Sequence, residues 1–229
     1  MRLTPRGVRR LRRAALVVVL LPVAYYQLCV IGIVYLRFFP PVATAVQLQR
    51  AVERSLDDRE PIRRYRWRPI DEISRHLPHA VVAAEDARFY RHIGFDWEEV
   101  QDAVRESQRS GEPVRGASTL THQLMKNLFF TTHRNPVRKL YEWGLTPVAH
   151  WILGRDRILE LYVNVVEFGP GLFGAEAAAR YYYETSAAAL TREQAARLAA
   201  VLPDPLRRRP WAMDNYSAII RERMRQLGW

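Results

Sequence analysis

The amino-acid sequence predicts a mainly α-helical domain behind one N-terminal membrane-spanning helix. Residues 14–36 carry no formal charge. After residue 40, helix start and stop signals recur about every 15 to 25 residues, whereas strand signals are scarce. With 229 residues, 48% of them hydrophobic, the chain can build one domain with a substantial core, but not two large ones.

The uncharged segment 14–36 is long enough to cross a bilayer. At about 1.5 Å per helical residue, it exceeds the roughly 30 Å of a hydrocarbon core. Six arginines precede it within residues 1–13, and only Arg37 follows before Arg50, so the positive-inside rule places the N-terminus in the cytoplasm. We therefore expect a cytoplasmic tail at 1–13, a transmembrane helix at 14–36, a juxtamembrane segment at 37–68 and a periplasmic domain at 69–229.

A cleaved signal peptide is the alternative for this segment, because Ala43-Thr44-Ala45 resembles a small-residue cleavage site. Signal h-regions run to about 7 to 15 residues, which is shorter than this segment and favours an anchor. Cys29 is the single cysteine and lies in the same segment. An intrachain disulfide and a four-thiol metal site are therefore excluded.

The net charge of +11 favours an anionic partner: nucleic acid, an acidic membrane surface or a phosphate-bearing substrate. A periplasmic domain makes nucleic acid the least favoured of the three. Arginine is the usual cation of this chain, and its two lysines are Lys126 and Lys139. The basic segment 63–68, which also carries Tyr65 and Trp67, could rest on anionic headgroups or form a solvated linker.

Capping residues and prolines mark the expected helices. Asp96 and Glu99 form a capping pair, Ser118 is a possible N-cap, and proline after Asn135 suits the first position of a helix. A loop is expected at 111–116, and Pro147 should kink or divide the helix that contains it. The expected helices cover residues 76–91, 97–109, 119–128, 136–153, 157–165, 174–183, 192–202 and 216–227, with Thr191 and Gln194 as a second capping pair.

Glu85 is the first candidate for chemistry. It follows the apolar run 81–84, so partial desolvation should disfavour its charged form and raise its pKa toward the range useful for general acid or base work. A solvated or ion-paired side chain is the alternative. Its neighbour Asp86 points about 100° away around a helix, and a structural role is expected for it.

The second candidate is the segment from Gly116 to Lys139. A glycine-bearing loop that opens a helix offers free backbone donors, and the cations that follow could hold a phosphate-type anion. A capped amphipathic helix with a solvated basic end is the alternative.

Four ordered motifs resemble those of glycosyltransferase family 51, and the likeness covers about residues 69–207. Among its members, the chain is most similar to monofunctional biosynthetic peptidoglycan transglycosylases, since no serine here has a lysine three places later, as a transpeptidase nucleophile would require. The motifs are Glu85-Asp86-x-x-Phe89-x-x-His92-x-Gly94-Phe95-Asp96, Gly116-x-Ser118-Thr119-x-x-x-Gln123-x-x-Lys126-Asn127, Arg138-Lys139-x-x-Glu142 and Arg157-Ile158-Leu159-Glu160-x-Tyr162-x-Asn164, followed by Phe168-Gly169, Phe173-Gly174, Ala177-Ala178, Tyr181-Tyr182 and Leu202-Pro203-Asp204-Pro205.

The resemblance implies a lysozyme-like glycosyltransferase domain with a small membrane-proximal jaw subdomain. It implies that the enzyme polymerises lipid II into β-1,4-linked glycan strands with inversion and releases undecaprenyl pyrophosphate, with Glu85 as general base. Glu142 would be the second catalytic glutamate, or would form only a helical ion pair with Arg138. The expected partners are lipid II, the lipid-linked nascent glycan, the bacterial inner membrane and other cell-wall synthesis and division proteins, with no nucleic acid.

The resemblance also implies a site for the departing diphosphate. Its expected substrate-binding residues are Ser118, Thr119, Gln123, Lys126, Asn127, Arg134, Arg138 and Lys139, and a divalent cation, Mg or Mn, is expected at Glu85 and Glu142. Two residues depart from the family pattern: His122 replaces a glutamine and Val163 replaces a leucine. A lysozyme-like muramidase and a catalytically silent lipid II-binding scaffold are the rival interpretations.

Overall fold

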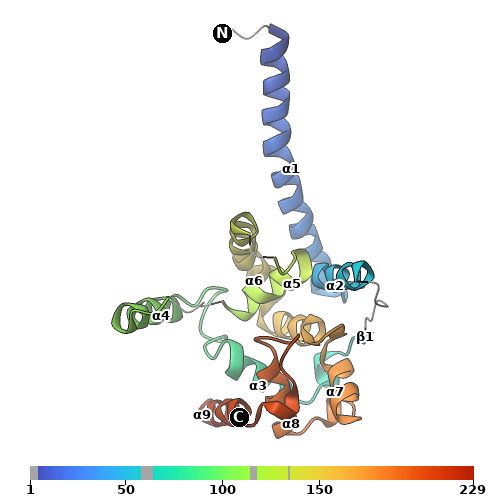
Figure 1. Ribbon diagram of the computed structural model, residues 1–229, viewed down its shortest axis with the longest axis vertical. Helices are drawn as coiled ribbons and strands as arrows, with labels where there is room; N and C mark the ends of the chain where they lie inside the picture. The colour runs from blue at the N-terminus through green and yellow to red at the C-terminus, as the bar shows by residue number, and fades with distance from the viewer. Residues whose placement is uncertain (1–4, 58–63, 114–117, 134) are drawn as a thin grey trace.

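The computed structural model describes residues 5–57, 64–113, 118–133 and 135–229, and only the backbone of 5–15. The protein is mainly α-helical, as predicted (Figure 1). Arg134, residues 114–116 of the expected loop 111–116, and Arg63 of the basic segment 63–68 lie outside the described residues.

Helix α1 (Pro5–Phe38) extends from the domain, and its residues Leu16–Phe38 are long and apolar enough to cross a membrane. The upper half stands free in Figure 1, whereas the lower half packs against α6. The hydroxyl of Tyr26 donates a hydrogen bond to the carbonyl of Gly144 at 3.0 Å, and Arg157 donates to that of Leu36 at 2.8 Å. The anchor is therefore part of the folded unit.

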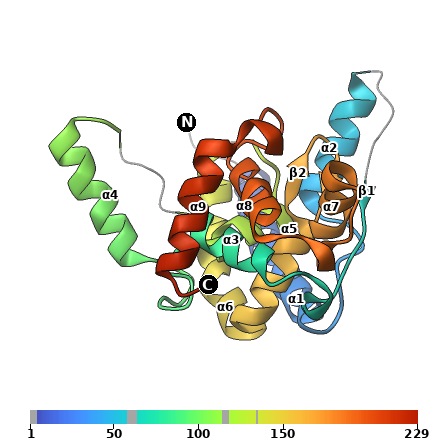
Figure 2. The ribbon, with the colours of Figure 1, turned by 90° about the horizontal axis from the view of Figure 1, so that it is seen from below.

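Among the remaining helices, α3 packs against α8, α9 and α6, α5 packs against α6 and α2, and α4 projects away from the others (Figure 1 and Figure 2). The core is continuous and includes the fully buried Leu77, Val82, Leu124, Leu161 and Tyr162. The helices are α2 (Ala45–Leu56), α3 (His76–Glu85), α4 (Trp97–Ser110), α5 (Leu120–Phe129), α6 (Pro136–Val165), α7 (Ala175–Tyr183), α8 (Arg192–Val201) and α9 (Asp214–Gln226), with 3-10 turns at Ile70–Glu72, Ala187–Ala189 and Pro210–Ala212.

A small sheet closes one side of the bundle. Strand β3 (Leu172–Phe173) lies between β1 (Arg64–Tyr65), its parallel neighbour, and β2 (Glu167–Gly169), its antiparallel neighbour. The buried Glu167 fixes the β2 turn, because its Oε1 accepts a hydrogen bond from the backbone of Gly171. Its Oε2 accepts another from Arg50, at 3.0 Å, which connects α2 to the sheet.

Three details of the predicted helices are wrong. The helix expected at 76–91 ends at Glu85, because Asp86 leaves the helical conformation and its carboxylate bonds to groups outside α3. The N-cap of α5 is Thr119 rather than Ser118, since the Thr119 side chain accepts the hydrogen bond from the His122 backbone. Pro147 lies inside α6 without dividing it, whereas the helix end expected at residue 153 is confirmed by a break at Gly154, where φ is 74° and ψ is 165°.

Candidate active site

Glu85 is the last residue of α3, and its side chain reaches a pocket of about 540 Å³. The run before it, Ala80–Ala83, is fully buried against the core, so the carboxylate stands where an apolar helix meets the pocket. Residues from α3, α5 and the C-terminal segment line this pocket: Ala83, Ala84, Glu85, Asp86, Ala87, Arg88, Asp96, Glu99, Ser118, Thr119, Gln123, Pro203, Tyr216 and Arg223.

Glu85 is held by a chain of two hydrogen bonds. Gln123 donates from Nε2 to Glu85 Oε2 at 2.8 Å, and the Gln123 Oε1 accepts from the hydroxyl of the fully buried Tyr162 at 2.7 Å. Burial raises the pKa of Glu85, and the Gln123 hydrogen bond and the charges of Lys126 and Arg208 oppose this shift. A carboxylate with a raised pKa suits proton transfer near neutral pH.

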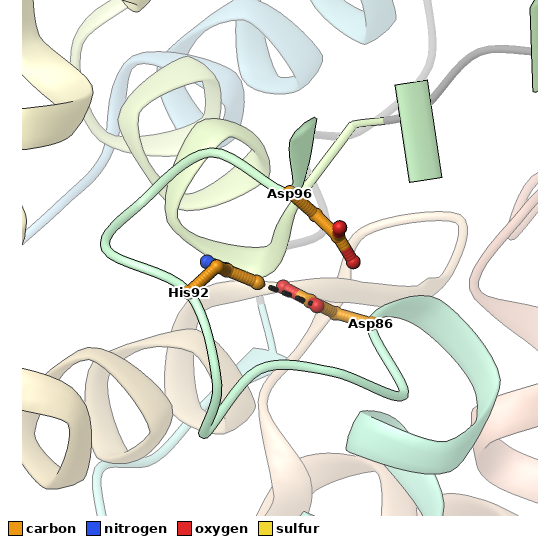
Figure 3. A group of neighbouring side chains, drawn as sticks. All are labelled: Asp86, His92 and Asp96. Atoms are coloured by element: carbon orange, nitrogen blue, oxygen red, sulfur yellow. Dashed lines mark hydrogen bonds and ion pairs between the residues drawn. The ribbon is translucent and has the colours of Figure 1, made fainter. Parts of the chain in front are cut away.

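Asp86 joins the end of α3 to the start of α5. One of its oxygens accepts a hydrogen bond from the Leu120 backbone at 3.0 Å, and the other lies 2.8 Å from His92 Nε2 (Figure 3). Thr119 strengthens the junction by donating to the Gly94 carbonyl at 2.7 Å. These bonds hold the ends of the two helices that carry Glu85 and Gln123, which agrees with a structural role for Asp86.

Within the described part of the chain, one side-chain group has the spacing of a metal site: Asp86, His92 and Asp96, with ligand atoms within 4.8 Å of one another (Figure 3). Their oxygens already have partners, however. Asp96 accepts from the Glu99 backbone and from Arg88 Nε, at 2.9 and 2.8 Å. Because Arg88 already supplies positive charge here, the group fits an internal ion-pair network better than a metal.

Glu142 is buried on α6 among cations. Its Oε1 lies 3.2 Å from Arg138 Nε and its Oε2 lies 3.7 Å from Lys139 Nζ. The Lys139 amine also donates to the Ser118 hydroxyl at 3.5 Å. A divalent cation at Glu85 and Glu142, as expected from the sequence, would have to compete with Arg138 and Lys139 for the Glu142 carboxylate.

Lys126 connects this cation group to Glu85. It lies on α5, one turn after Gln123, and burial lowers the pKa of its amine. The charges of Glu142 and Glu85 both raise that pKa, and those of Arg138 and Lys139 lower it. Among the residues that the structure describes, Lys126 has no hydrogen-bond or ion-pair partner, so its amine is available to an anion.

The other expected substrate-binding residues divide into two groups. Ser118, Thr119 and Gln123 line the pocket together with Glu85. Asn127 is buried and donates to the Gln123 carbonyl at 3.0 Å, which fixes the helix rather than the pocket surface.

His122 is buried against aromatic rings rather than turned to the pocket. Its ring lies 5.2 Å from Phe95 and 6.3 Å from Trp143, centroid to centroid, and neither ring nitrogen has a hydrogen-bond partner among the residues that the structure describes. Burial, and then the charge of Lys139, lowers its pKa to about 4. The imidazole is therefore neutral at physiological pH.

Sequence reasoning missed two contributors to the site. Tyr162 appeared only as a motif residue, because nothing in its spacing indicates that its hydroxyl bonds to Gln123. Arg208 acts on Glu85 through its charge, and it lies over the ring of Tyr216, 5.6 Å from the centroid. The arginine-rich stretch 207–209 was a weak signal, since arginine is abundant throughout the chain.

The site combines a candidate glutamate base with a group of cations on a mainly α-helical scaffold. This arrangement is typical of a group-transfer enzyme that acts on an anionic substrate. A family model described as Transglycosylase matches residues 53–227. The chain therefore belongs to the transglycosylase family and is a peptidoglycan glycosyltransferase with a lysozyme-like domain, which polymerises glycan strands.

Curated relatives agree with this assignment. A biosynthetic peptidoglycan transglycosylase of Caulobacter vibrioides is 42% identical over 97% of this chain and 92% of its own length. Proteins of the same name from Chromobacterium violaceum and Pseudomonas syringae pv. syringae are both 44% identical, over 79% and 87% of this chain and 79% and 86% of their own lengths. The family match begins at residue 53, inside the segment expected to be juxtamembrane.

Proposed function

We propose that this enzyme polymerises lipid II with Glu85 as the general base and Lys126 as the principal cation for the diphosphate leaving group. The observation that supports this most is the 2.8 Å hydrogen bond from Gln123 to Glu85, because Lys126 follows Gln123 by three residues on α5 and therefore lies on the same side of that helix. A base and a leaving-group cation are the two requirements of glycosyl transfer from a lipid diphosphate.

In the proposed reaction, Glu85 removes the proton from the 4-hydroxyl of the acceptor's N-acetylglucosamine. The oxygen attacks C1 of the N-acetylmuramoyl unit at the lipid-linked end of the nascent strand. The bond from C1 to the diphosphate oxygen breaks, and undecaprenyl pyrophosphate leaves with the electron pair. An α-linked donor thus gives a β-1,4 bond, with inversion.

The cations of α5 and α6 would stabilise the charge that develops on the departing diphosphate. Within the described residues Lys126 has no ion-pair partner and is available for this task, whereas Arg138 and Lys139 are paired with the buried Glu142. We therefore assign Glu142 a positioning role: it keeps two cations beside Lys126 despite their mutual repulsion. The expected divalent cation remains a prediction, and no step of the reaction is assigned to it.

A muramidase would use its glutamate as an acid and would have no need of these cations. The names of the relatives also favour synthesis over hydrolysis.

We also propose that the N-terminus lies in the cytoplasm, with the domain in the periplasm at the inner membrane. The span Leu16–Phe38 and the arginines before it support this orientation. The domain boundaries stay as predicted from the sequence, with the anchor at 14–36, the juxtamembrane segment at 37–68 and the catalytic domain from 69. Because the anchor and a lipid-linked substrate would both diffuse in the membrane plane, tethering would restrict the pocket's search for substrate to that plane.

Labelled lipid II in nanodiscs tests the reaction. We expect the parent enzyme to form polymer that a muramidase digests, and Glu85→Gln to form at least about a thousandfold less per unit time. Lys126→Met should lose about a hundredfold or more, whereas Lys139→Met should lose less, because Lys139 is one of two cations on Glu142. Full activity of Glu85→Gln would refute the base assignment, and shortening of added glycan would favour hydrolysis.

A further inference from the structure

Two arginines from the C-terminal part of the chain lie at the Glu85 pocket, and we call them the distal arginines. Arg223 on α9 lines the pocket itself, and Arg208, which follows α8, lines a second pocket of about 650 Å³. Pro203 and Tyr216 line both pockets, so the two adjoin. The charge of Arg208 lowers the pKa of Glu85, which places its guanidinium near the base. The proposed reaction assigns no substrate contact to either arginine.

Backbone carbonyls hold both distal arginines in place. Arg208 Nη1 donates to the carbonyl of Ala200 at 3.0 Å, and Arg223 Nη1 donates to that of Ala83 at 3.4 Å. Both residues are partly buried. Among the residues that the structure describes, neither guanidinium has a carboxylate partner. A guanidinium has five N–H donors, so most of them remain for an anion.

Other charged side chains at the two pockets are already paired. Arg88, which lines the first pocket, donates from Nε to Asp96 at 2.8 Å. Asp214, which lines the second pocket, is paired with Arg197. The distal arginines differ from these residues because no acid of the described chain offsets their charge. A fixed guanidinium that opens onto a pocket is suited to bind a carboxylate or a phosphate.

The position of the distal arginines in the fold favours one of these anions. In Figure 1, α8 and α9 lie beyond α3, at the end of the domain away from the N-terminus of α1, whereas α5 and α6 lie near α1. Helix α6 packs against α1 and α5, and α3 packs against α8 and α9 (Figure 2). A diphosphate attached to a membrane lipid therefore lies at the level of the α5 and α6 cations. The anion at the distal arginines belongs to a part of the substrate that extends away from the membrane.

We propose that the distal arginines bind a carboxylate of the peptide that a peptidoglycan unit carries on its muramoyl lactyl group. This inference rests on the proposed function, because it takes lipid II as the substrate. Two carboxylate oxygens match the fork of guanidinium donors, and the peptide is the part of this substrate that carries carboxylates. The substrate is then held by its diphosphate at Lys126 and by its peptide at the distal arginines. Binding at two charged points orients the sugars that lie between them over Glu85.

Two substrate probes that cannot polymerise test the proposal. The first is lipid II with a methyl ether at the 4-hydroxyl of N-acetylglucosamine, which removes the proton that the base would take. The second is the same molecule with its peptide carboxylates amidated. Titration calorimetry with the full-length enzyme in detergent micelles gives the Kd of each probe.

We expect the parent to bind the amidated probe about tenfold more weakly than the acidic one, because one charge-assisted contact is lost. Arg223→Met should weaken binding of the acidic probe about tenfold and of the amidated probe less than twofold, and Arg208→Met should give the same pattern. Arg225→Met is the matched control on α9, since Arg225 is exposed and pairs with Glu222 on the same helix. Its Kd for both probes should equal that of the parent.

Unchanged binding of the acidic probe by Arg223→Met and Arg208→Met would overturn the proposal. An equal loss for both probes would also overturn it, because the arginines would then contact the diphosphate or only support the fold. Binding of the amidated probe at the parent's Kd shows that each variant is folded. Polymerisation of unmodified lipid II by the parent reports the proposed function separately: an inactive parent with the expected Kd pattern would refute the catalysis and leave the peptide contact.

Discussion

The hydrogen-bond chain from Tyr162 to Glu85 predicts that a residue outside the pocket sets the orientation of the base. Burial raises the pKa of Tyr162 well above its ordinary value, so its hydroxyl stays protonated and can donate to Gln123 Oε1. That bond turns the amide so that Nε2 faces Glu85. In Tyr162→Phe the donor is lost, and a flipped amide would present its oxygen to the carboxylate.

The magnitude follows from one buried hydrogen bond, which is worth about 1 to 1.5 kcal/mol. We therefore expect Tyr162→Phe to lower kcat about tenfold with little change in KM, measured as lipid II polymerisation in nanodiscs. Tyr182→Phe is the matched control, since it removes a tyrosine hydroxyl that donates to the Phe168 carbonyl at 2.9 Å, away from Glu85. Its kcat should be unchanged.

A double-mutant cycle separates positioning from general destabilisation. If Tyr162 acts through Gln123, then Tyr162→Phe should have no further effect on kcat in a Gln123→Leu background. An equal tenfold loss in both backgrounds would refute the reasoning, as would a loss that follows thermal stability alone.

Four further predictions concern charge. Glu85→Gln should raise the free energy of unfolding at pH 7 by about 1 kcal/mol in a denaturant titration, because it removes a desolvated charge. In the parent, folding raises the pKa of Glu85, so its contribution to stability is most favourable at acid pH. That contribution is lost as the pH rises through the folded-state pKa. Gln123→Leu should shift the acid limb of the pH-rate profile to higher pH, since its hydrogen bond lowers the pKa of Glu85; an unchanged limb would contradict this role. His122→Gln should leave the profile between about pH 6 and 8 unchanged, because a group with a pKa of about 4 does not titrate there, and a shifted profile would show that His122 does titrate. EDTA should lower the rate less than about tenfold, since Lys126 and its neighbours supply positive charge without a metal; complete loss, restored by Mg or Mn, would instead support the metal expectation.

Local signals in the sequence predicted most of the helices, because capping is local chemistry. Asp96 opens α4, Asn135 opens α6, and Thr191 with Gln194 opens α8, as expected. Glycine at 154 marked a helix end in the sequence, but the chain resumes as a helix immediately, so the structure has one bent element there. Where Asp86 ends α3, the cause is a bond to Leu120, 34 residues away, which no local pattern indicates.

The sequence predicted which residue types form the site, but not which of them contact one another. The apolar run before Glu85 correctly predicted the direction of its pKa shift, and the motif lysine and arginine positions fall beside one buried carboxylate, Glu142. The sequence could not place Tyr162 or Arg208 near Glu85, because those contacts join segments 77 and 123 positions apart along the chain. It also did not indicate that Leu48, Val52 and Leu56 on α2 stay exposed, since apolar residues that face a core have the same spacing.

The break at Gly154 separates an exposed part of α6 from a buried part. With φ at 74° and ψ at 165°, this backbone is open to glycine and strained for any residue with a Cβ. Before the break, α6 has large apolar side chains on its outer face; after it, Ile158, Leu161 and Tyr162 are fully buried. The backbone at Gly154 thus fixes the angle between the exposed apolar face of α6 and the Tyr162 hydroxyl that bonds to Gln123.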